Sequence, residues 1–142
     1  MKTHTAGFIF DHALENVLLI QKLRPEWQNG KLNGIGGKIE PGESSLDCIV
    51  REIKEETDLT TEKNKWIYAG KNTAPEWSVD FYAYHLTNSS YIPTSVTDEK
   101  VGWYSLSNLP SNLIPNLEWL IPLAKNKLTK DEYGEFSVTY TK

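Results

Sequence analysis

Three glutamates with helical spacing are the residues of this chain best suited to chemistry. At roughly 100° per residue, Glu52, Glu55 and Glu56 share one arc of a helix, about one turn apart. Their charges repel each other by roughly 0.2–0.5 kcal/mol per pair on a bare helix. A divalent cation reverses that penalty, because Mg²⁺ and Mn²⁺ prefer oxygen ligands and are often held by carboxylates together with substrate phosphates. The cluster predicts a metal site, although a solvated acidic face is the simpler interpretation of three glutamates taken alone.

The segment around these glutamates has the pattern of an amphipathic helix. Ser44 and Asp47 resemble a capping box at its start, in which a serine hydroxyl accepts a hydrogen bond from the backbone N–H three residues later. Arg51 stands four residues before Glu55 and can pair with it along the helix. The apolar residues recur with helical spacing on the neighbouring arc and are expected to face the core: Leu46, Ile49, Val50 and Ile53.

Glycines precede this helix at the point where the backbone would have to approach a ligand. Residues 33–38 read Asn-Gly-Ile-Gly-Gly-Lys, and glycine lets the main chain pass close to another group. The carbonyl and amide groups of this segment are then available to a metal ion or a phosphate. Pro41 and Gly42 follow as a turn signal that leads into the helix.

Together these residues form the pattern Gly-x5-Glu-x7-Arg-Glu-apolar-x-Glu-Glu-x-x-apolar, which resembles the Nudix box. One position departs from the family, which usually has glycine where this chain has Asp58. The position ends the helix, where left-handed backbone is common, so we expect about 1 kcal/mol of local strain and an intact site. The matching positions are Gly37, Glu43, Arg51, Glu52, Ile53, Glu55, Glu56 and Leu59.

The resemblance implies a set of metal ligands. In such proteins the box glutamates, here Glu52, Glu55 and Glu56, hold the metal together with a backbone carbonyl, here that of Gly36. Many MutT-like members add a glutamate from a later loop, and Glu99 is the residue at that place. The resemblance also makes Glu52 the leading candidate to orient or deprotonate the attacking water.

The resemblance gives the neighbouring residues supporting roles. Lys38 and Arg24 are the expected contacts to substrate phosphates. Glu43 and Arg51 are expected to brace the loop against the helix, and Gly37 to serve the local backbone structure.

A base pocket is implied by a further similarity, to MutT-type nucleoside triphosphate pyrophosphohydrolases. It places Asn33 in the pocket and gives Trp27 the position of an aromatic residue there. The alternatives are a turn role for Asn33 and a packing role for Trp27 over the core. Members acting on oxidised purines carry two adjacent aspartates where this chain has Asn116 and Leu117. Asn116 is therefore expected in the pocket, but its amide cannot share protons as a carboxyl pair does, so a preference for oxidised purines does not carry over.

Length and composition fit an ordinary globular protein. The 142 residues predict a single Nudix domain over 1–142, and the net charge of −4 argues against a nucleic-acid backbone as the main partner. The single cysteine, Cys48, excludes an intrachain disulfide and fits a reducing compartment. No run of residues is long and apolar enough for a membrane span or a signal peptide, so we expect a cytoplasmic protein, monomeric or homodimeric.

The remaining pattern predicts an α/β (α+β) fold. The Nudix resemblance implies an α/β/α sandwich with a mixed central sheet and two main helices. The second helix is expected over residues 116–128, starting at Asn116 and kinked at Pro122. Extended segments are expected over residues 3–10, 17–22, 32–39, 66–71, 78–86, 101–106 and 135–141.

The leading hypothesis is a Mg²⁺-dependent pyrophosphohydrolase that converts a nucleoside triphosphate, possibly modified or oxidised, to the monophosphate and pyrophosphate, as nucleotide-pool sanitising enzymes do. One alternative keeps the chemistry and changes the substrate to ADP-ribose, a dinucleotide polyphosphate or an RNA cap. Another is a non-catalytic Nudix domain that senses a nucleotide. The presence of all three box glutamates favours an enzyme.

Overall fold

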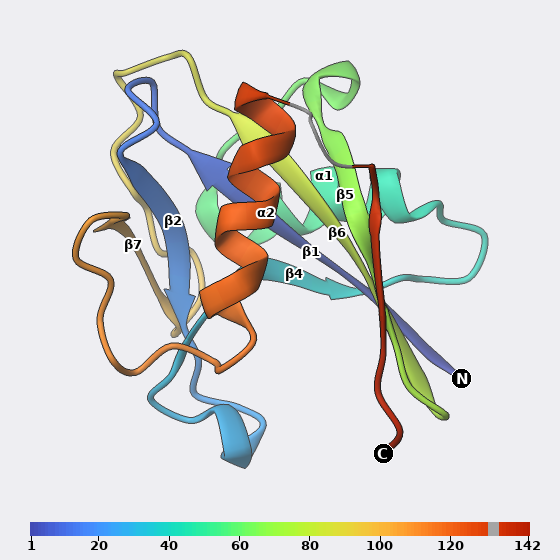
Figure 1. Cartoon of the computed structure of the whole chain (residues 1–142). Helices are drawn as coiled ribbons and strands as arrows, with labels where there is room; N and C mark the ends of the chain where they lie inside the picture. The colour runs from blue at the N-terminus through green and yellow to red at the C-terminus, as the bar shows by residue number, and fades with distance from the viewer. Residues whose placement is uncertain (131–133) are drawn as a thin grey trace.

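A β-sheet runs through the middle of the computed structural model, with α1 (Ser45–Thr57) behind it and α2 (Leu117–Thr129) in front (Figure 1). The structure describes residues 1–130 and 134–142. This arrangement is the α/β/α sandwich that the sequence predicts, and its sheet is mixed, as expected. Within the described residues, no helix is long and apolar enough to cross a membrane.

The first strand, β1 (Lys2–Phe10), is the centre of the sheet. It pairs in parallel with β6 (Trp77–His85) along its whole length, and antiparallel with β2 (Asn16–Gln21) and β4 (Ile35–Lys38). The strand order is β3-β2-β1-β6-β5-β8, with β4 paired to β1 and β7 paired to β2. The remaining strands are β3 (Leu32–Asn33), β5 (Ile67–Thr73), β7 (Lys100–Ser105) and β8 (Phe136–Thr139).

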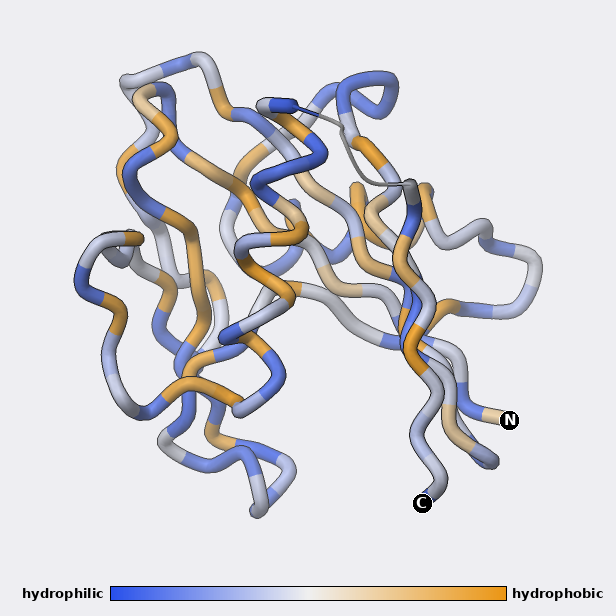
Figure 2. The backbone as a smooth tube through the Cα atoms, in the orientation of Figure 1, coloured by the Kyte–Doolittle hydropathy of each residue, from blue (hydrophilic) through white to orange (hydrophobic). Residues whose placement is uncertain are grey.

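Each face of the sheet has its own hydrophobic core. Side chains alternate along β6, so that Phe81 and Ala83 pack with the residues of α2 whereas Tyr82 and Tyr84 pack with those of α1. Hydrophobic residues accordingly concentrate along the strands and on α2, and the loops are more hydrophilic (Figure 2). A sheet covered on both faces holds its strands rigidly, which fixes the position of the loops between them.

The start of α1 agrees with the prediction, because the Ser44 hydroxyl accepts a hydrogen bond from the backbone N–H of Asp47 at 3.0 Å. Its end also agrees: Asp58 has φ 62°, in the left-handed region, and Lys54 Nζ lies 3.0 Å from its carboxylate. All four residues expected on the buried face belong to the core under α1, and Cys48 and Thr57 are buried in addition. Leu46 and Val50 are only partly buried, and the positions fully inside are Cys48, Ile49, Ile53 and Thr57.

The helix α1 packs closely on β1. A Cβ atom at Gly7 would come within 2.9 Å of the Ile49 side chain, so the absence of a side chain at Gly7 lets the helix approach the strand. Cys48 lies on the side of the helix beside β4, where its thiol is close to the carbonyls of Gly37 and Lys38. Burial, followed by the charge of Glu43, raises the pKa of the Cys48 thiol to about 12, which keeps it protonated.

The loops hold structure that the sequence did not predict. The segment before β3 contains a 3₁₀ turn, η1 (Glu26–Gln28), and a second one, η2 (Lys63–Lys65), precedes β5. The extended segment expected over 32–39 is divided into β3 and β4 at Gly34, because the two halves pair with different strands, β2 and β1. Pro122 lies inside α2, as predicted.

Candidate active site

The box glutamates lie where α1 passes over the glycine-rich strand β4. Glu52 is the member closest to that strand, and a Cβ atom at Gly37 would collide with its carboxylate. A Cβ atom at Gly36 would collide with the backbone carbonyl of Thr5 on β1. The absence of side chains at both glycines therefore lets β4 lie between β1 and the Glu52 carboxylate.

Arg51 is the hub of the ion pairs around this site. Its guanidinium donates to both oxygens of Glu43, at 2.7 and 2.9 Å, and to the Lys38 carbonyl at 3.2 Å. One of its nitrogens, Nη1, also lies 3.0 Å from Glu52 and 3.1 Å from Glu55. The predicted pairing of Arg51 with Glu55 is confirmed. Hydrogen bonds from Arg51 lower the pKa of Glu43 to about 2, so this carboxylate stays charged and clamps the loop to the helix.

The surroundings of Glu56 are unfavourable for a charged carboxylate. One of its carboxylate oxygens, Oε2, is buried and has no hydrogen-bond partner among the described residues. Burial, followed by the nearby charge of Glu52, raises the pKa of Glu56 to about 7. Burial likewise raises the pKa of Glu52. Glu52 is paired with Arg51, whereas the buried oxygen of Glu56 has no cationic partner among the described residues.

Glu99 lies on the same side of the molecule, and its charge is among those that raise the pKa of Glu56. Its side chain is buried and accepts hydrogen bonds from Lys22 Nζ at 3.0 Å, Leu23 N at 2.7 Å and Arg24 N at 3.4 Å. Glu99 therefore anchors the start of the loop between β2 and β3. Lys22 is a residue of this region that the sequence analysis missed, because only the fold brings it beside a glutamate 77 positions away.

Carboxylate oxygens such as those of the box glutamates are the ligands that a hard divalent cation prefers. The fold provides part of the environment that such a cation would need. Within residues 1–130 and 134–142, no three acidic, histidine or cysteine side chains already form a metal cage. Glu52 and Glu55 are instead turned toward Arg51. The buried and unpaired oxygen of Glu56 is the observation in favour of a metal, since such an atom is normally satisfied by a partner, a water or an ion.

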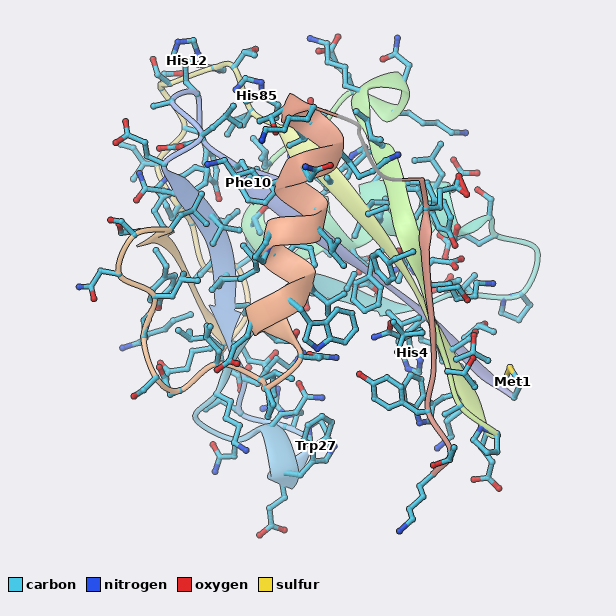
Figure 3. The ribbon with its side chains drawn as sticks, viewed as in Figure 1. Met1, His4, Phe10, His12, Trp27 and His85 are labelled. Atoms are coloured by element: carbon cyan, nitrogen blue, oxygen red, sulfur yellow. The ribbon has the colours of Figure 1, made fainter. Side chains whose placement is uncertain are left out.

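The expected phosphate contacts lie around the outside of this cluster. The side chain of Lys38 is exposed at the end of β4. Arg24 forms a two-point ion pair with Asp98, at 2.7 and 3.2 Å, in which both side chains are largely exposed. Trp27 projects into solvent from η1, with 61% of its surface exposed (Figure 3), so it does not fold over the core. Its position leaves the aromatic face free for a ligand.

The two asparagines expected in the base pocket are held by different elements. The side-chain amide of Asn33, on β3, donates to the Gln28 side chain at 3.0 Å, and its oxygen accepts a hydrogen bond from the backbone N–H of Gly34 at 2.8 Å. Asn116 precedes α2 on the other face of the sheet from α1, and its side chain makes no capping hydrogen bond. The Asn116 side chain donates instead to the Tyr140 hydroxyl at 3.4 Å. The oxygen of its side-chain amide is buried and has no hydrogen-bond partner among the described residues.

Replacing Gly37 tests the closeness of β4 to the acidic cluster. We expect Gly37→Ala to lower kcat/KM for the best substrate at least about tenfold, because the new methyl group must push the Glu52 carboxylate aside. Gly102→Ala is the matched control, since a Cβ atom there makes only an ordinary 3.6 Å contact. Equal kinetics for the two variants would show that the position of Glu52 does not matter for turnover.

Comparison with curated proteins finds bacterial hydrolases. A stretch of 99 residues is 28% identical to the NAD-capped RNA hydrolase NudC of Pseudomonas syringae pv. tomato, covering 68% of this chain and 34% of that protein. The NudC of Pseudomonas putida strain F1 is 31% identical over 90 residues, covering 61% of this chain and 31% of that protein. The chain thus spans only about a third of the length of these relatives.

Comparison with solved structures finds the same fold. A MutT protein of Bacillus halodurans superposes with a TM-score of 0.70 and 25% identity, covering 99% of this chain and 91% of that one. The NUDIX domain of Shewanella oneidensis NrtR, solved with ADP-ribose, has a TM-score of 0.68 at 21% identity, covering 89% and 88% of the two chains. The model of the NUDIX domain matches residues 2–125, which include the whole glutamate-bearing segment. The protein belongs to the NUDIX domain family.

Proposed function

We propose that the protein is a Mg²⁺-dependent pyrophosphohydrolase that cleaves a nucleoside triphosphate to the monophosphate and pyrophosphate. The observation that carries this proposal is the buried, unpaired Oε2 of Glu56 beside the Glu52 carboxylate. The Glu56 carboxylate lies within reach of the charges of Glu52, Glu55 and Glu99, and a bound cation would compensate for them. Membership of the NUDIX domain family and the hydrolases among its relatives support the same conclusion.

In this proposal Glu52, Glu55 and Glu56 hold the metal, with the Gly36 carbonyl and Glu99 as further ligands. When bound, Mg²⁺, or Mn²⁺ in its place, would supply positive charge that offsets developing negative charge and would lower the pKa of the attacking water.

Other residues of the chain position these ligands. Glu52, held between Gly37 and Arg51, is fixed closely enough to orient the attacking water or accept its proton. The ion pair of Arg51 with Glu43 attaches the loop before α1 to the helix and would hold the two together during turnover.

The nucleotide would lie across β4. The glutamates lie on α1, which covers one face of the sheet, and Asn116 precedes α2, which covers the other face. Among the described strands, β4 pairs only with β1, so its other edge carries no strand. A substrate with its phosphates at Glu52 and its base near Asn116 would pass the exposed side chain of Lys38. In this proposal Asn33 on β3 and Trp27 on η1 contact the nucleoside, and Arg24 contacts a phosphate.

A second candidate substrate class is favoured by the relatives. The curated relatives are named NAD-capped RNA hydrolases, and one structural neighbour was solved with ADP-ribose. Both ligands contain a nucleoside diphosphate joined to a second group, so the same metal chemistry would cleave them. The net charge of −4 supplies no broad basic surface for an RNA chain, which is why we place the nucleoside triphosphate first.

One assay separates these functions. The purified protein would be incubated with Mg²⁺ and with each nucleoside triphosphate, ADP-ribose, NAD and a dinucleotide polyphosphate. Pyrophosphate release from a triphosphate supports the first proposal, and two monophosphates from ADP-ribose or NAD support the second. Binding of these compounds without any cleavage would identify a nucleotide sensor and overturn both.

Metal and pH dependence provide a separate prediction. Excess chelator should abolish turnover, and Mg²⁺ or Mn²⁺ should restore it. Activity at subsaturating Mg²⁺ should rise about tenfold per pH unit below pH 7, because protons compete with the metal for Glu56, whose pKa is raised to about 7 by burial and by Glu52. A pH–rate profile at two Mg²⁺ concentrations checks this. Undiminished turnover in chelator would rule the mechanism out.

A further inference from the structure

Residues 86–99 form the β6–β7 loop, which is attached to the last turn of α1 by two hydrogen bonds. The loop leads from the end of β6 to the start of β7 (Figure 1). The Tyr91 hydroxyl donates to the Thr57 carbonyl at 3.1 Å. The backbone N–H of Val96 donates to the Glu56 carbonyl at 3.3 Å. The last carbonyls of a helix have no partner within the helix, so the loop supplies the donors that these two positions need.

The Tyr91 side chain also holds the loop itself in shape. Its hydroxyl accepts a hydrogen bond from the backbone N–H of Thr94 at 3.2 Å, which joins two positions of the loop. Its ring packs edge-on against Trp103 of β7, with ring centroids 6.3 Å apart. The apolar side chains of Ile92 and Val96, by contrast, are 79% and 55% exposed and pack little surface. Tyr91 therefore anchors this part of the loop.

The same loop carries Glu99, the proposed metal ligand that does not belong to α1. The backbone N–H of Glu99 donates to the Thr97 hydroxyl at 3.2 Å. The Ser95 hydroxyl accepts a hydrogen bond from the backbone N–H of Val101 at 2.9 Å, which joins the loop to β7. Glu99 is thus fixed to the sheet, whereas Glu56 belongs to the last turn of α1. The β6–β7 loop connects the helix that bears one ligand with the strand that follows the other.

We propose that Tyr91 is a positioning residue for the metal site, because its hydrogen bond to the end of α1 holds Glu56 at the spacing from Glu99 that one cation requires. This inference rests on the proposed function, since it takes both glutamates as ligands of one ion. Val96 touches the backbone of Glu56 and stands three residues before Glu99, so the Cα atoms of Val96 and Glu99 lie within about 11 Å of each other. Oxygen ligands lie about 2.1 Å from Mg²⁺ in near-ideal geometry, so a small shift of one carboxylate weakens the site.

A purely structural role for Tyr91 predicts a different result. If Tyr91 only stabilises the loop, loss of its hydroxyl lowers the unfolding temperature and leaves the affinity for a cation as it was. If Tyr91 positions the metal site, the loss appears in the affinity for the cation. That loss then depends on the presence of Glu99, because a ligand that has been removed cannot be misplaced.

The test measures Mn²⁺ binding by calorimetry, without nucleotide and without turnover. Tyr91→Phe removes the hydroxyl and keeps the ring that packs on Trp103. The matched control is Tyr84→Phe, because the Tyr84 hydroxyl accepts a hydrogen bond of the same 3.1 Å length from the backbone N–H of Glu62, which is not a proposed ligand. Glu99→Gln and the double variant Tyr91→Phe/Glu99→Gln complete a double-mutant cycle.

We expect Tyr91→Phe to weaken Mn²⁺ binding about fivefold and Tyr84→Phe to bind Mn²⁺ like wild type. In the protein that already carries Glu99→Gln, Tyr91→Phe should have no further effect on Mn²⁺ affinity. With a nucleotide substrate, Tyr91→Phe should raise the Mg²⁺ concentration for half-maximal turnover by a similar factor. The kcat at saturating Mg²⁺ and the KM for the nucleotide should stay within about twofold of wild type, because Tyr91 acts on metal binding.

Wild-type Mn²⁺ affinity in Tyr91→Phe, or an equal loss of affinity in Tyr84→Phe, would show that the Tyr91 hydroxyl has a structural role only. Additive losses in the double variant would show that Tyr91 does not act through the position of Glu99. Wild-type protein that binds no Mn²⁺ would also overturn the inference. Wild-type protein that binds Mn²⁺ but hydrolyses no nucleotide would contradict the proposed function and leave this inference standing.

Discussion

Glu56→Gln is expected to lower kcat by at least about 100-fold at saturating Mg²⁺ while the protein stays folded. The substitution keeps the shape of the side chain and removes the charge from the buried oxygen that has no hydrogen-bond partner among the described residues. Loss of one negative ligand weakens metal binding and reduces the charge stabilisation available in the transition state. Steady-state kinetics over a range of Mg²⁺ concentrations measures both effects.

The same substitution should make the metal-free protein more stable. Burial, followed by the charge of Glu52, raises the pKa of Glu56 to about 7 in the folded state, above the ordinary glutamate value of 4.5. The folded protein therefore binds more protons between these values, and its stability falls as the pH rises through that window. The full difference corresponds to on the order of 3 kcal/mol. Glutamine avoids the burial of a charge, so we expect a gain on the order of 2 kcal/mol at pH 8.

Denaturant unfolding at pH 5 and pH 8, in chelator, measures this gain. The Glu118→Gln variant is the control, because Glu118 is an exposed residue in the first turn of α2. An active and destabilised Glu56→Gln protein would mean that Glu56 is an ordinary structural residue and that the metal site lies elsewhere.

Arg51→Met is expected to lower the unfolding temperature by roughly 5 °C or more and to reduce activity at the same time. Arg51 makes hydrogen bonds to Glu43, Glu52, Glu55 and the Lys38 carbonyl. Methionine keeps much of the apolar stem but leaves these acceptors without their cation. The acidic residues then repel each other, and the loop before α1 loses its attachment to the helix.

The pH dependence of stability distinguishes this explanation from a general loss of packing. Hydrogen bonds from Arg51 lower the pKa of Glu43 to about 2, from the ordinary glutamate value of 4.5. The stabilisation is therefore present above about pH 4.5 and is lost as the pH falls toward 2. Arg51→Met should remove this acid-dependent loss.

Arg24→Met provides the comparison for stability. Its ion pair with Asp98 is exposed on both sides, so its removal should change the unfolding temperature very little. If the Arg51→Met and Arg24→Met proteins unfold at the same temperature, the ion pairs of Arg51 do not stabilise the fold as proposed.

The sequence determined the chemistry and its immediate support. The Nudix resemblance, the start of α1 at Ser44, the left-handed end at Asp58 and the pairing of Arg51 with Glu55 are all confirmed. These features depend on contacts within about one helical turn or on a motif of fixed spacing. Short-range geometry is readable from sequence because the helix period alone sets it.

The sequence also determined most of the sheet. Each extended segment expected from the sequence overlaps an observed strand. The burial of Cys48 and Thr57 on α1 was missed, because it depends on the strands against which the helix packs. The division of residues 32–39 at Gly34 was also missed, since it follows from pairing with two different partners.

Only the tertiary structure decided which distant residues meet. Lys22 reaches Glu99 because the register of β2 and β7 joins segments that are far apart in the chain. Nothing local distinguishes Glu56 from the other glutamates of α1. Its role follows from a buried oxygen without a partner among the described residues, and burial is a property of the packed fold, where removal of water makes an unpaired polar atom costly.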